Sequence, residues 1–250
     1  MDNPIFIGKV LHELDQLPST NKYATEMLSK SNPAEGTVIS TYNQYDGRGQ
    51  IDSSWESAPN RNFSISVILY PNFLQPTQQF ELNKAISLGV CSFLTEQLKS
   101  KVHIKWPNDL YVSDKKIGGI LIQNSISSNQ IKSSIIGIGI NVNQKIFKHA
   151  PNATSLSLQA NKFFDLNTLR IKLFAALEYY YIMLKAGSFK SLHEEYLENL
   201  LNYKIEALYQ NTKGERFLGT VVGIDDFGKI LIVINGVERT FNIKEIQLIK

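Results

Sequence analysis

Three apolar runs in close succession constrain the fold of this chain more than any other feature. They span residues 102–106, 117–126 and 131–142, and Asn129-Gln130 between the last two is a pair typical of a hairpin turn. At least part of the sheet is therefore expected to be antiparallel. Further runs of β-branched and aromatic residues predict strands at 37–42 and 62–70.

The helical spacing of apolar residues predicts helices at 80–98, 167–185 and 188–201. Another helix is expected to begin at Ser19 or Thr20, whose hydroxyl can cap it, and to end near residues 31–33. Because hairpins occur together with helices that are segregated from them, we expect an α+β fold rather than a doubly wound sheet. Its sheet should be mixed and largely antiparallel, with helices on one side.

The composition changes after Leu201. Short β runs at 204–209, 216–224, 229–234 and 237–243 are separated by turn signals, which are Lys213-Gly214, Phe227-Gly228 and Asn235-Gly236. This spacing predicts a small β-barrel, which at ~45 residues usually needs a neighbour for its stability. We therefore expect two domains, residues 1–201 and 202–250.

Charge and composition exclude several classes of protein. Lys and Arg total 26 against 23 Asp and Glu, a net charge of +3, and no basic cluster is denser than Lys115-Lys116. Nucleic-acid readers usually carry such clusters, whereas a pocket for one small anion needs only a few cations. No apolar run approaches the ~18 residues that span a bilayer. The first residues do not form a signal peptide, and the single cysteine, Cys91, cannot form an internal disulfide, so we expect a soluble, cytoplasmic protein.

Two polar segments adjoin predicted strands. Gly47-Arg48-Gly49 lies in a long polar loop, 43–60, where glycines allow close approach to a ligand and an arginine can bind a carboxylate or phosphate. In Lys105-Trp106-Pro107-Asn108-Asp109, an amide and a carboxylate follow a strand, where they suit a base or a ligand clamp. A flexible surface loop and a simple Asx turn are the alternative interpretations.

Two predicted strands contain glycines, at Gly118-Gly119 and at Gly137 and Gly139. Glycine inside a strand is unfavourable unless something must come close to the backbone. With the glycine loop and with Lys116, these positions indicate one ligand that lies against a face of the sheet. A lysine-rich surface hairpin is the alternative.

Other catalytic classes lack their signatures. No metal-ligand spacing occurs among the histidines, which are His12, His103, His149 and His193. No serine lies in a nucleophile elbow. We therefore expect neither a zinc site nor a serine hydrolase.

Taken in order, these segments resemble the biotin protein ligases, over almost the whole chain. The motifs that carry the resemblance are Ser19-Thr20-Asn21, Gln44 with Gly47-Arg48-Gly49, Trp55-Glu56-Ser57, Lys105-Trp106-Pro107-Asn108-Asp109-Leu110, Lys116 with Gly118-Gly119, Gly139-Ile140-Asn141-Val142-Asn143, Ala153-Thr154-Ser155-Leu156, and Phe217-Leu218-Gly219 with Gly223-Ile224-Asp225. The most specific are the KWPNDL segment and the Ser-Thr-Asn segment. The resemblance implies a class II synthetase-like catalytic domain followed by an SH3-like β-barrel.

The resemblance also implies a two-step reaction. The carboxylate of biotin attacks the α-phosphate of ATP, with Mg²⁺ present, and gives biotinyl-5'-AMP and pyrophosphate. A lysine amine of a biotin carboxyl carrier domain, in a carboxylase or decarboxylase, then attacks the mixed anhydride. The chain would be a biotin–[biotin carboxyl-carrier protein] ligase.

Carried over position by position, the resemblance implies site residues. Lys116 would reach the biotin carboxyl and the α-phosphate, Asp109 would orient or deprotonate the incoming lysine, and Arg48 would be the third catalytic residue. The implied biotin-binding residues are Ser19, Thr20, Asn21, Gln44, Gly47, Arg48, Gly49, Gln50, Lys116, Gly118 and Gly119. The implied residues for ATP and the adenylate are Arg48, Trp55, Trp106, Asn108, Lys116 and Asn141. No protein ligand to a metal is implied.

The chain departs from the family pattern at several points. Gln50 stands where a second arginine often holds the adenylate, and Asp52 replaces a glycine. A C-terminal arginine that some members place near ATP has no clear match at 246–250. Regulatory members carry an N-terminal helix-turn-helix domain, for which the residues before Ser19 leave no room, so a ligase without a role on DNA is expected.

Other interpretations stay open at this point. Lipoate and octanoyl ligases share the fold, but their Arg-Arg-x-Ser-Gly-Gly-Gly loop is absent. A non-catalytic binding module would tolerate changes at Lys116 and Asp109, and a nucleic-acid protein would interleave aromatic and basic surface residues. The sequence does not specify the acceptor, and the glycine-bearing strands could pair across a two-fold axis in a homodimer.

Gln50→Arg is expected to slow the release of bound adenylate. A guanidinium binds phosphate bidentately, whereas the amide of Gln50 cannot, and the carboxylate of Asp52 adds repulsion. The measurement is the dissociation rate of biotinyl-5'-AMP from the purified protein. A variant that releases the adenylate no more slowly would contradict this expectation.

Overall fold

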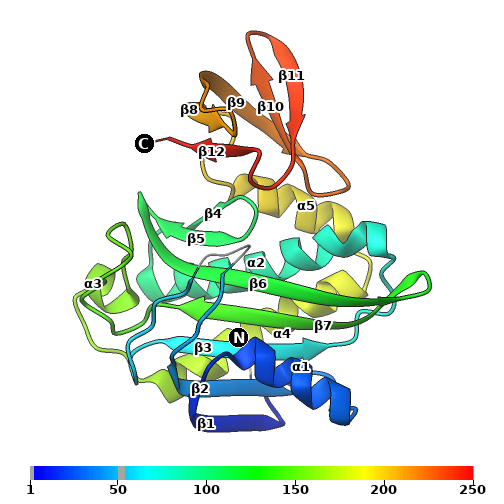
Figure 1. Cartoon of the computed structure of the whole chain (residues 1–250), viewed down its shortest axis with the longest axis vertical. Coiled ribbons are helices and arrows are strands. Elements are labelled where there is room, and N and C mark those ends of the chain that lie inside the picture. The colour runs from blue at the N-terminus through cyan, green and yellow to red at the C-terminus, as the bar shows by residue number, and fades with distance from the viewer. Residues whose placement is uncertain (1–2, 50–53, 250) are drawn as a thin grey trace.

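A long hairpin forms the centre of the molecule and consists of β6 (Lys115–Ser127) and β7 (Gln130–Ile140). The computed structural model describes residues 3–49 and 54–249. In this part of the chain a seven-stranded sheet, here the large sheet, and a five-stranded sheet, here the small sheet, are formed. Figure 1 shows the small sheet beyond the end of the large sheet at which β4 and β5 lie.

The large sheet has the strand order β1-β2-β3-β7-β6-β5-β4. β1 and β2 are parallel and all other neighbours are antiparallel, which confirms the expected mixed, largely antiparallel sheet. Its remaining strands are β1 (Leu11–Leu17), β2 (Val38–Gln44), β3 (Phe63–Leu69), β4 (His103–Lys105) and β5 (Asp109–Val112).

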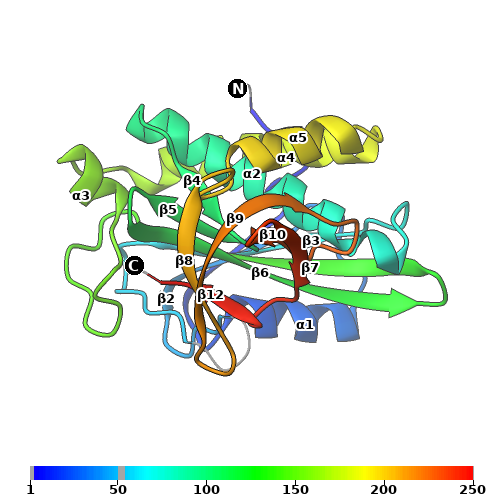
Figure 2. The same ribbon diagram turned by 90° about the horizontal axis from the view of Figure 1, so that it is seen from above.

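Helices lie on both faces of the large sheet, as Figure 2 shows. α2 (Gln79–Leu98), α4 (Leu166–Lys185) and α5 (Phe189–Glu198) pack together on one face, as the sequence predicts. α1 (Thr20–Lys30) lies on the other face, where it contacts β2, β3 and β7. The expectation of helices on one side is therefore wrong for α1, because this face is apolar as well and Ala24 packs there against Ile39, Ile68 and Ile135. The short helix α3 (Leu156–Ala160) and the 3₁₀ turn η1 (Pro76–Gln78) complete this part.

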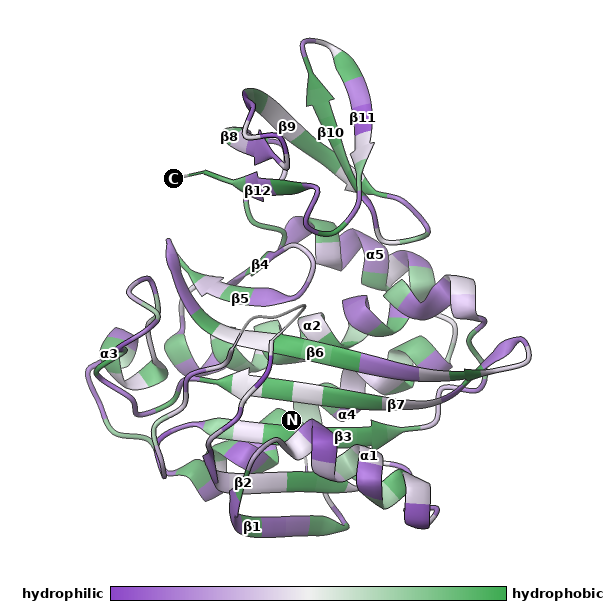
Figure 3. Ribbon diagram, in the orientation of Figure 1, coloured by the Kyte–Doolittle hydropathy of each residue, from purple (hydrophilic) through white to green (hydrophobic). Residues whose placement is uncertain are grey.

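The small sheet is antiparallel throughout and has the order β11-β10-β9-β8-β12. Its strands are β8 (Glu206–Asn211), β9 (Arg216–Ile224), β10 (Ile230–Ile234), β11 (Val237–Phe241) and β12 (Ile246–Leu248). β10 is apolar along its length, whereas the edge strand β11 carries hydrophilic residues (Figure 3). This arrangement is compatible with the SH3-like barrel that the resemblance implies.

A continuous cluster of buried apolar residues joins the two sheets. It extends from α2 and α4 into the small sheet, where it includes Tyr209, Val221, Ile224, Ile230 and Ile232. The small sheet therefore shares its core with the rest of the molecule, as a barrel of this size needs. The division at residues 201 and 202 stays a proposal.

The single cysteine lies in the core. Cys91 is 2% exposed, on the buried side of α2, and burial raises the pKa of its thiol to about 12.

None of the helices in the described ranges has the length and apolar character that a membrane crossing requires.

The pairing of the glycine-bearing strands bears on how two copies of the chain could join. Gly118 is paired with Ile140, and Gly119 is paired with Gly139, in the same chain. The other edge of β6 is paired with β5 only from Lys115 to Gly119, and the other edge of β7 is paired with β3 from Ser134 to Ile140. Gly118, Gly119 and Gly139 are thus paired within the chain, but the β5 side of β6 has no strand partner among the described residues from Ile120 to Ser127. Pairing across a two-fold axis stays a proposal, and it would use this edge.

A buried carboxylate holds the N-terminal segment on α4. Glu178 is 4% exposed and accepts the backbone N–H groups of Ile5, Phe6 and Ile7 at 2.5, 2.7 and 2.8 Å. Three donors satisfy both oxygens, so the buried charge is compensated without a cationic side chain.

Glu178→Gln is expected to lower the free energy of unfolding by about 1–3 kcal/mol, because an amide nitrogen would face backbone donors. Urea unfolding of the two proteins measures the difference. The matched control is Glu194→Gln, which removes an exposed carboxylate 3.9 Å from Lys190 and should change stability by less than ~0.5 kcal/mol. Equal effects of the two substitutions would contradict the anchoring role of Glu178.

Candidate active site

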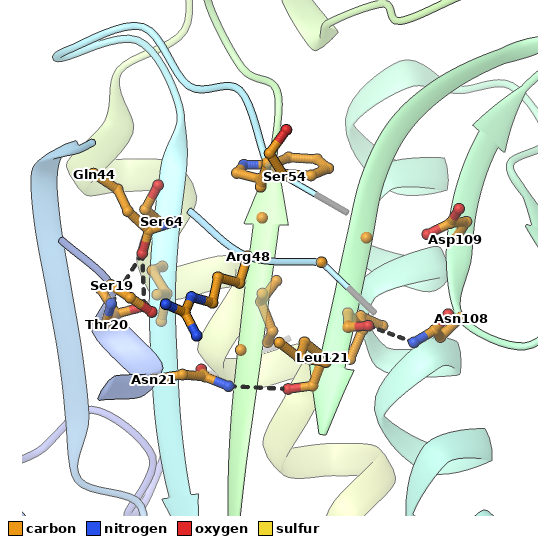
Figure 4. A pocket seen from close by; sticks show the side chains of 18 of the residues that line it. Ser19, Thr20, Asn21, Gln44, Arg48, Ser54, Ser64, Asn108, Asp109 and Leu121 are labelled. Atoms are coloured by element: carbon orange, nitrogen blue, oxygen red, sulfur yellow. Dashed lines mark hydrogen bonds between the residues drawn. The ribbon is translucent and has the colours of Figure 1, made fainter. Parts of the chain in front are cut away.

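A pocket of about 280 Å³ opens on the face of the large sheet that carries α1. Figure 4 shows residues from the start of α1 on one side of it, and Asn108 and Asp109 on the other. Its lining is Ser19, Thr20, Asn21, Gln44, Arg48, Gly49, Ser54, Trp55, Ser64, Ile65, Pro107, Asn108, Asp109, Lys116, Gly119, Ile120, Leu121, Gly137, Ile138, Gly139 and Lys244.

At three glycines the floor of the pocket is bare backbone. Strand register places Gly119 beside Gly139 and Gly139 beside Ser64, in one row across three strands. A Cβ atom at Gly139 would lie 2.4 Å from Cε2 of Trp55, and one at Gly137 would lie 2.4 Å from Oδ1 of Asn21. These glycines are therefore needed so that the walls can close onto the sheet.

The first wall is the start of α1, and its polar groups are held in a network. Ser19 caps the helix, and Oε1 of Gln44 accepts the backbone N–H of Thr20 at 2.9 Å. Oγ of Ser66 lies 2.7 Å from Oγ1 of Thr20 and 2.6 Å from Oδ1 of Asn21, and its single proton can serve only one of them at a time. Fixed hydroxyl and amide groups suit a polar, uncharged part of a ligand.

Asn21 connects this wall to the floor. Its Nδ2 donates to Oε1 of Gln123 at 2.9 Å and to the carbonyl oxygen of Leu121 at 3.4 Å, the latter drawn in Figure 4. Both acceptors belong to β6, so the start of α1 is tied to the central hairpin.

The opposite wall carries an ion pair. Nζ of Lys116 lies 2.7 Å from Oδ2 of Asp109, and each side chain is 32% exposed. The pair lies over Gly119, because a Cβ atom there would be 3.1 Å from Oδ1 of Asp109 and 3.5 Å from Nζ of Lys116. Nζ is also 5.7 Å from the centre of the Trp55 ring. A cation and a carboxylate, both partly open to the pocket, can bind an anion and take up a proton.

Arg48 and Trp55 belong to the third wall. The N–H of Trp55 donates to the carbonyl oxygen of Gly47 at 2.8 Å. Arg48 pairs with Asp46 at 3.5 Å, but the two side chains are 70% and 54% exposed, so this pair is weak. Arg48 can therefore turn toward a ligand at little cost.

Glu56 anchors the segment that follows Trp55. Its carboxylate accepts the backbone N–H groups of Lys148 and His149 at 2.9 and 2.7 Å, and Nε2 of Gln144 at 3.2 Å. Burial by itself would raise the pKa of Glu56, but these donors outweigh burial and lower that pKa. The carboxylate stays charged and the segment stays fixed at neutral pH.

Four of the residues that the resemblance implies lie outside the pocket lining. Gly118 faces the core, where a Cβ atom would approach Leu110 and Ile140. Gly47 is buried, and a Cβ atom there would lie 2.6 Å from the carbonyl oxygen of Trp55. Nε1 of Trp106 donates to Gly228 in the small sheet at 2.9 Å. Nδ2 of Asn141 donates to the carbonyl oxygen of Thr154 at 2.9 Å. Gln50 and Asp52 lie outside the described residues.

The structure also brings residues to the pocket that the sequence did not single out. Ser64 and Ile65 belong to the strand predicted at 62–70, where serines alternate with apolar residues, and this alternation was an available signal. Lys244 comes from the β11–β12 connection, just before the segment 246–250. No local sequence pattern predicts that Lys244 lines the pocket, because its position depends on how the small sheet packs against the large sheet.

Two buried polar atoms near this site lack a hydrogen-bond partner within the described chain. They are Nε1 of Trp55 and Oδ1 of Asn141. Buried polar atoms are normally paired, and Trp55 lines the pocket, so its unpaired donor is available to a ligand, whereas Asn141 lies outside the lining.

Comparisons with known proteins show similarity over most of the chain. The biotin/lipoate A/B protein ligase family matches residues 13–141. The bifunctional ligase/repressor BirA of Bacillus subtilis is 33% identical over 251 residues, 94% of this chain and 73% of that protein. The biotin--[acetyl-CoA-carboxylase] ligase of Mycobacterium tuberculosis is 23% identical over 94% of this chain and 88% of that protein. The structure of the Aquifex aeolicus biotin protein ligase with biotin and ATP has a TM-score of 0.79 and 27% identity, covering 97% of this chain and 99% of that one.

Gly139→Ala is expected to displace the Trp55 ring from the pocket wall, because the added Cβ would overlap it. The protein has two tryptophans and therefore two indole N–H signals in a ¹⁵N NMR spectrum. The Trp55 signal, assigned with Trp55→Phe, should move while the Trp106 signal stays. Gly223→Ala is the control, since its Cβ would meet only Leu231, at 3.4 Å, and should move neither signal. An unmoved Trp55 signal in Gly139→Ala would contradict the close contact between Gly139 and the Trp55 ring.

Proposed function

Since the chain belongs to the biotin/lipoate A/B protein ligase family, we propose that it activates biotin with ATP and transfers the biotinyl group to a lysine of a carrier protein. The observation that carries the proposal is the Lys116–Asp109 pair at 2.7 Å above the glycine floor. The pair places a cation and a proton acceptor beside one small pocket, which is what the two steps need.

In the first step, an oxygen of the biotin carboxylate forms a bond to the α-phosphorus of ATP. The bond between that phosphorus and the bridging oxygen breaks, and pyrophosphate leaves. Two anions must approach each other, so fixed positive charge lowers the barrier. Lys116 supplies this charge in the pocket, and Arg48 and Lys244 add to it at the pocket lining.

In the second step, the neutral amine of the acceptor lysine attacks the carbonyl carbon of the adenylate. The bond from that carbon to the phosphate oxygen breaks and AMP leaves. The amine loses a proton, which the carboxylate of Asp109 accepts. Lys116, held 2.7 Å away, keeps that carboxylate in place.

Binding roles follow from the chemistry of each wall. The ureido ring of biotin carries one carbonyl acceptor and two N–H donors, which match the hydroxyl and amide groups of Ser19, Thr20, Asn21 and Gln44. Gly49 and Gly119 let the ligand lie close to the backbone. The resemblance also assigns Gly47, Gly118 and Gln50 to biotin, and it alone supports these three.

On the nucleotide side, we assign Trp55, Asn108 and Asn141. Asn108 is 3% exposed and donates through Nδ2 to Ile120, so its place at the pocket lining is fixed. The unpaired Nε1 of Trp55 suits an acceptor of the nucleotide, whereas Asn141, outside the pocket lining, is assigned on the resemblance alone. Trp106 receives a different role below.

Mg²⁺ is proposed to arrive with ATP, where it would screen the phosphates and the leaving pyrophosphate. Residues 3–49 and 54–249 contain no group of three or more His, Cys, Asp or Glu side chains that could hold a metal ion. No protein ligands are therefore assigned to it.

The acceptor is proposed to be the carrier domain of a biotin-dependent carboxylase or decarboxylase. We further propose a cytoplasmic location. We also propose a homodimer, which by strand pairing could use the edge of β6 beyond Gly119 or the outer edges of β1 and β4.

The test mixes the purified protein with biotin, ATP, Mg²⁺ and a biotin carboxyl carrier domain, and weighs the acceptor by mass spectrometry. One added biotinyl group is expected. Lys116→Met should reduce the rate about 100-fold or more, because it removes charge that stabilises the transition state. Lys115→Met is the matched control, since Lys115 is exposed and absent from the pocket lining, and its rate should stay within about twofold of the unmodified protein.

Release of pyrophosphate, followed in the same mixtures, separates the two steps. Asp109→Asn should slow transfer more than pyrophosphate release. Transfer of lipoate or octanoate in place of biotin would move the chain to the sister ligases of the same family. No transfer of any acyl group would overturn the proposal.

A further inference from the structure

Trp106 faces the small sheet rather than the pocket. Its indole Nε1 donates to the carbonyl oxygen of Gly228 at 2.9 Å, 122 residues further along the chain. Gly228 lies in the turn between β9 and β10, here called the docking turn (225–229). The residue next to Trp106, Pro107, lines the pocket. Trp106 therefore joins the pocket wall to a separate sheet.

The docking turn is internally rigid. Oδ1 of Asp225 accepts the N–H groups of Phe227 and Lys229 at 3.0 and 2.8 Å, and the N–H of Gly228 donates to the carbonyl oxygen of Asp225 at 3.0 Å. Gly228 has φ +86°, a conformation that glycine adopts without strain. A turn held in this way transmits its position to the strands that it joins.

The same turn is pressed against α2. A Cβ atom at Gly228 would lie 2.2 Å from Cδ2 of Phe80, so the glycine backbone is in direct contact with that ring. Phe80 in turn packs edge-on against Tyr196 of α5, with ring centres 5.8 Å apart and an interplanar angle of 80°. Both rings are buried.

The contacts close into a ring at the pocket wall. The hydroxyl of Tyr196 donates to the carbonyl oxygen of Pro107 at 2.6 Å. The Trp106-Pro107 segment is therefore held from two sides, by Gly228 through the indole and by Tyr196 through the carbonyl. Directly after it come Asn108 and Asp109, which line the pocket.

The small sheet also contributes a cationic residue to the pocket lining. Lys244 lies between β11 and β12 and belongs to the pocket lining. β9, β10 and β11 are consecutive neighbours in one sheet, so the docking turn and the start of the segment with Lys244 move as one body. Release of the turn would move Lys244 relative to the pocket.

We propose that Trp106 is a positioning residue, whose bond to Gly228 docks the small sheet so that Lys244 reaches the phosphates of ATP. This rests on the proposed function. Trp106 does not touch the nucleotide; it acts on ATP binding through Lys244. The affinity for ATP then depends on a contact between the two sheets, whereas the affinity for biotin, at the other wall, does not.

The test is a double-substitution cycle on the full chain, with the KM for ATP, the KM for biotin and kcat measured for each protein. Trp106→Phe keeps a ring but removes the donor, and Lys244→Met removes the charge. Each should raise the KM for ATP about fivefold to tenfold, the size of one net hydrogen bond, and leave the KM for biotin within about twofold. If Trp106 acts through Lys244, the double variant should be no worse than the larger single effect.

A second test displaces the turn without changing Trp106, and it compares one variant with a matched control. Gly228→Ala adds a Cβ that overlaps Phe80, whereas Gly236→Ala adds one at a similar positive φ, +78°, with nothing within 4 Å. Only Gly228→Ala should raise the KM for ATP. Thermal unfolding of each variant separates loss of stability from this effect.

Two results would overturn the positioning role. One is an unchanged KM for ATP in both Trp106→Phe and Gly228→Ala. The other is a double variant in which the two losses multiply, because independent effects would then explain them. Failure of the unmodified protein to transfer biotin would instead overturn the proposed function, so the two failures are distinguishable.

Discussion

The pairing of β7 with β3 on one side and with β6 on the other is the constraint on which the pocket depends. Side chains alternate along a strand, so this register turns Gly119, Gly137 and Gly139 toward the pocket and Ile136 and Ile140 toward the core. A shift of one residue would bury the glycines and turn apolar side chains toward the ligand. The core that stabilises the fold therefore also sets the floor on which the chemistry takes place.

Carboxylates in this protein serve two purposes that their surroundings separate. Glu178 and Glu56 accept several backbone N–H groups each, and they hold the N-terminal segment and the segment after Trp55 in place. Asp109 instead faces a single cation at a partly exposed position. Fully satisfied carboxylates give rigidity, whereas one with spare acceptor capacity remains available for a proton.

Long, strongly patterned segments were predictable from the sequence, and short or half-exposed ones were not. The helices expected at 80–98 and 167–185 are Gln79–Leu98 and Leu166–Lys185, because their apolar residues repeat over five turns. β1 carries apolar residues three apart at an exposed sheet edge, and β5 has only four residues, so neither shows the alternation of a strand. Sequence motifs led to Lys116 and Asp109, which the structure pairs. The direction of Trp106 and the arrival of Lys244 depend on the docking of the small sheet, which no local pattern encodes.

The glycine floor also determines where a pocket of this kind can diverge in evolution. Natural variation works by exchanging side chains, and the three glycines of the floor leave no room for one, since even a methyl group at Gly137 would collide with Asn21. Drift toward a ligand of another size must therefore take place in the walls, at the start of α1 and in the loop around Arg48. Descendants of one ancestor could accept different acids there and still keep the same ion pair and the same sheet beneath it.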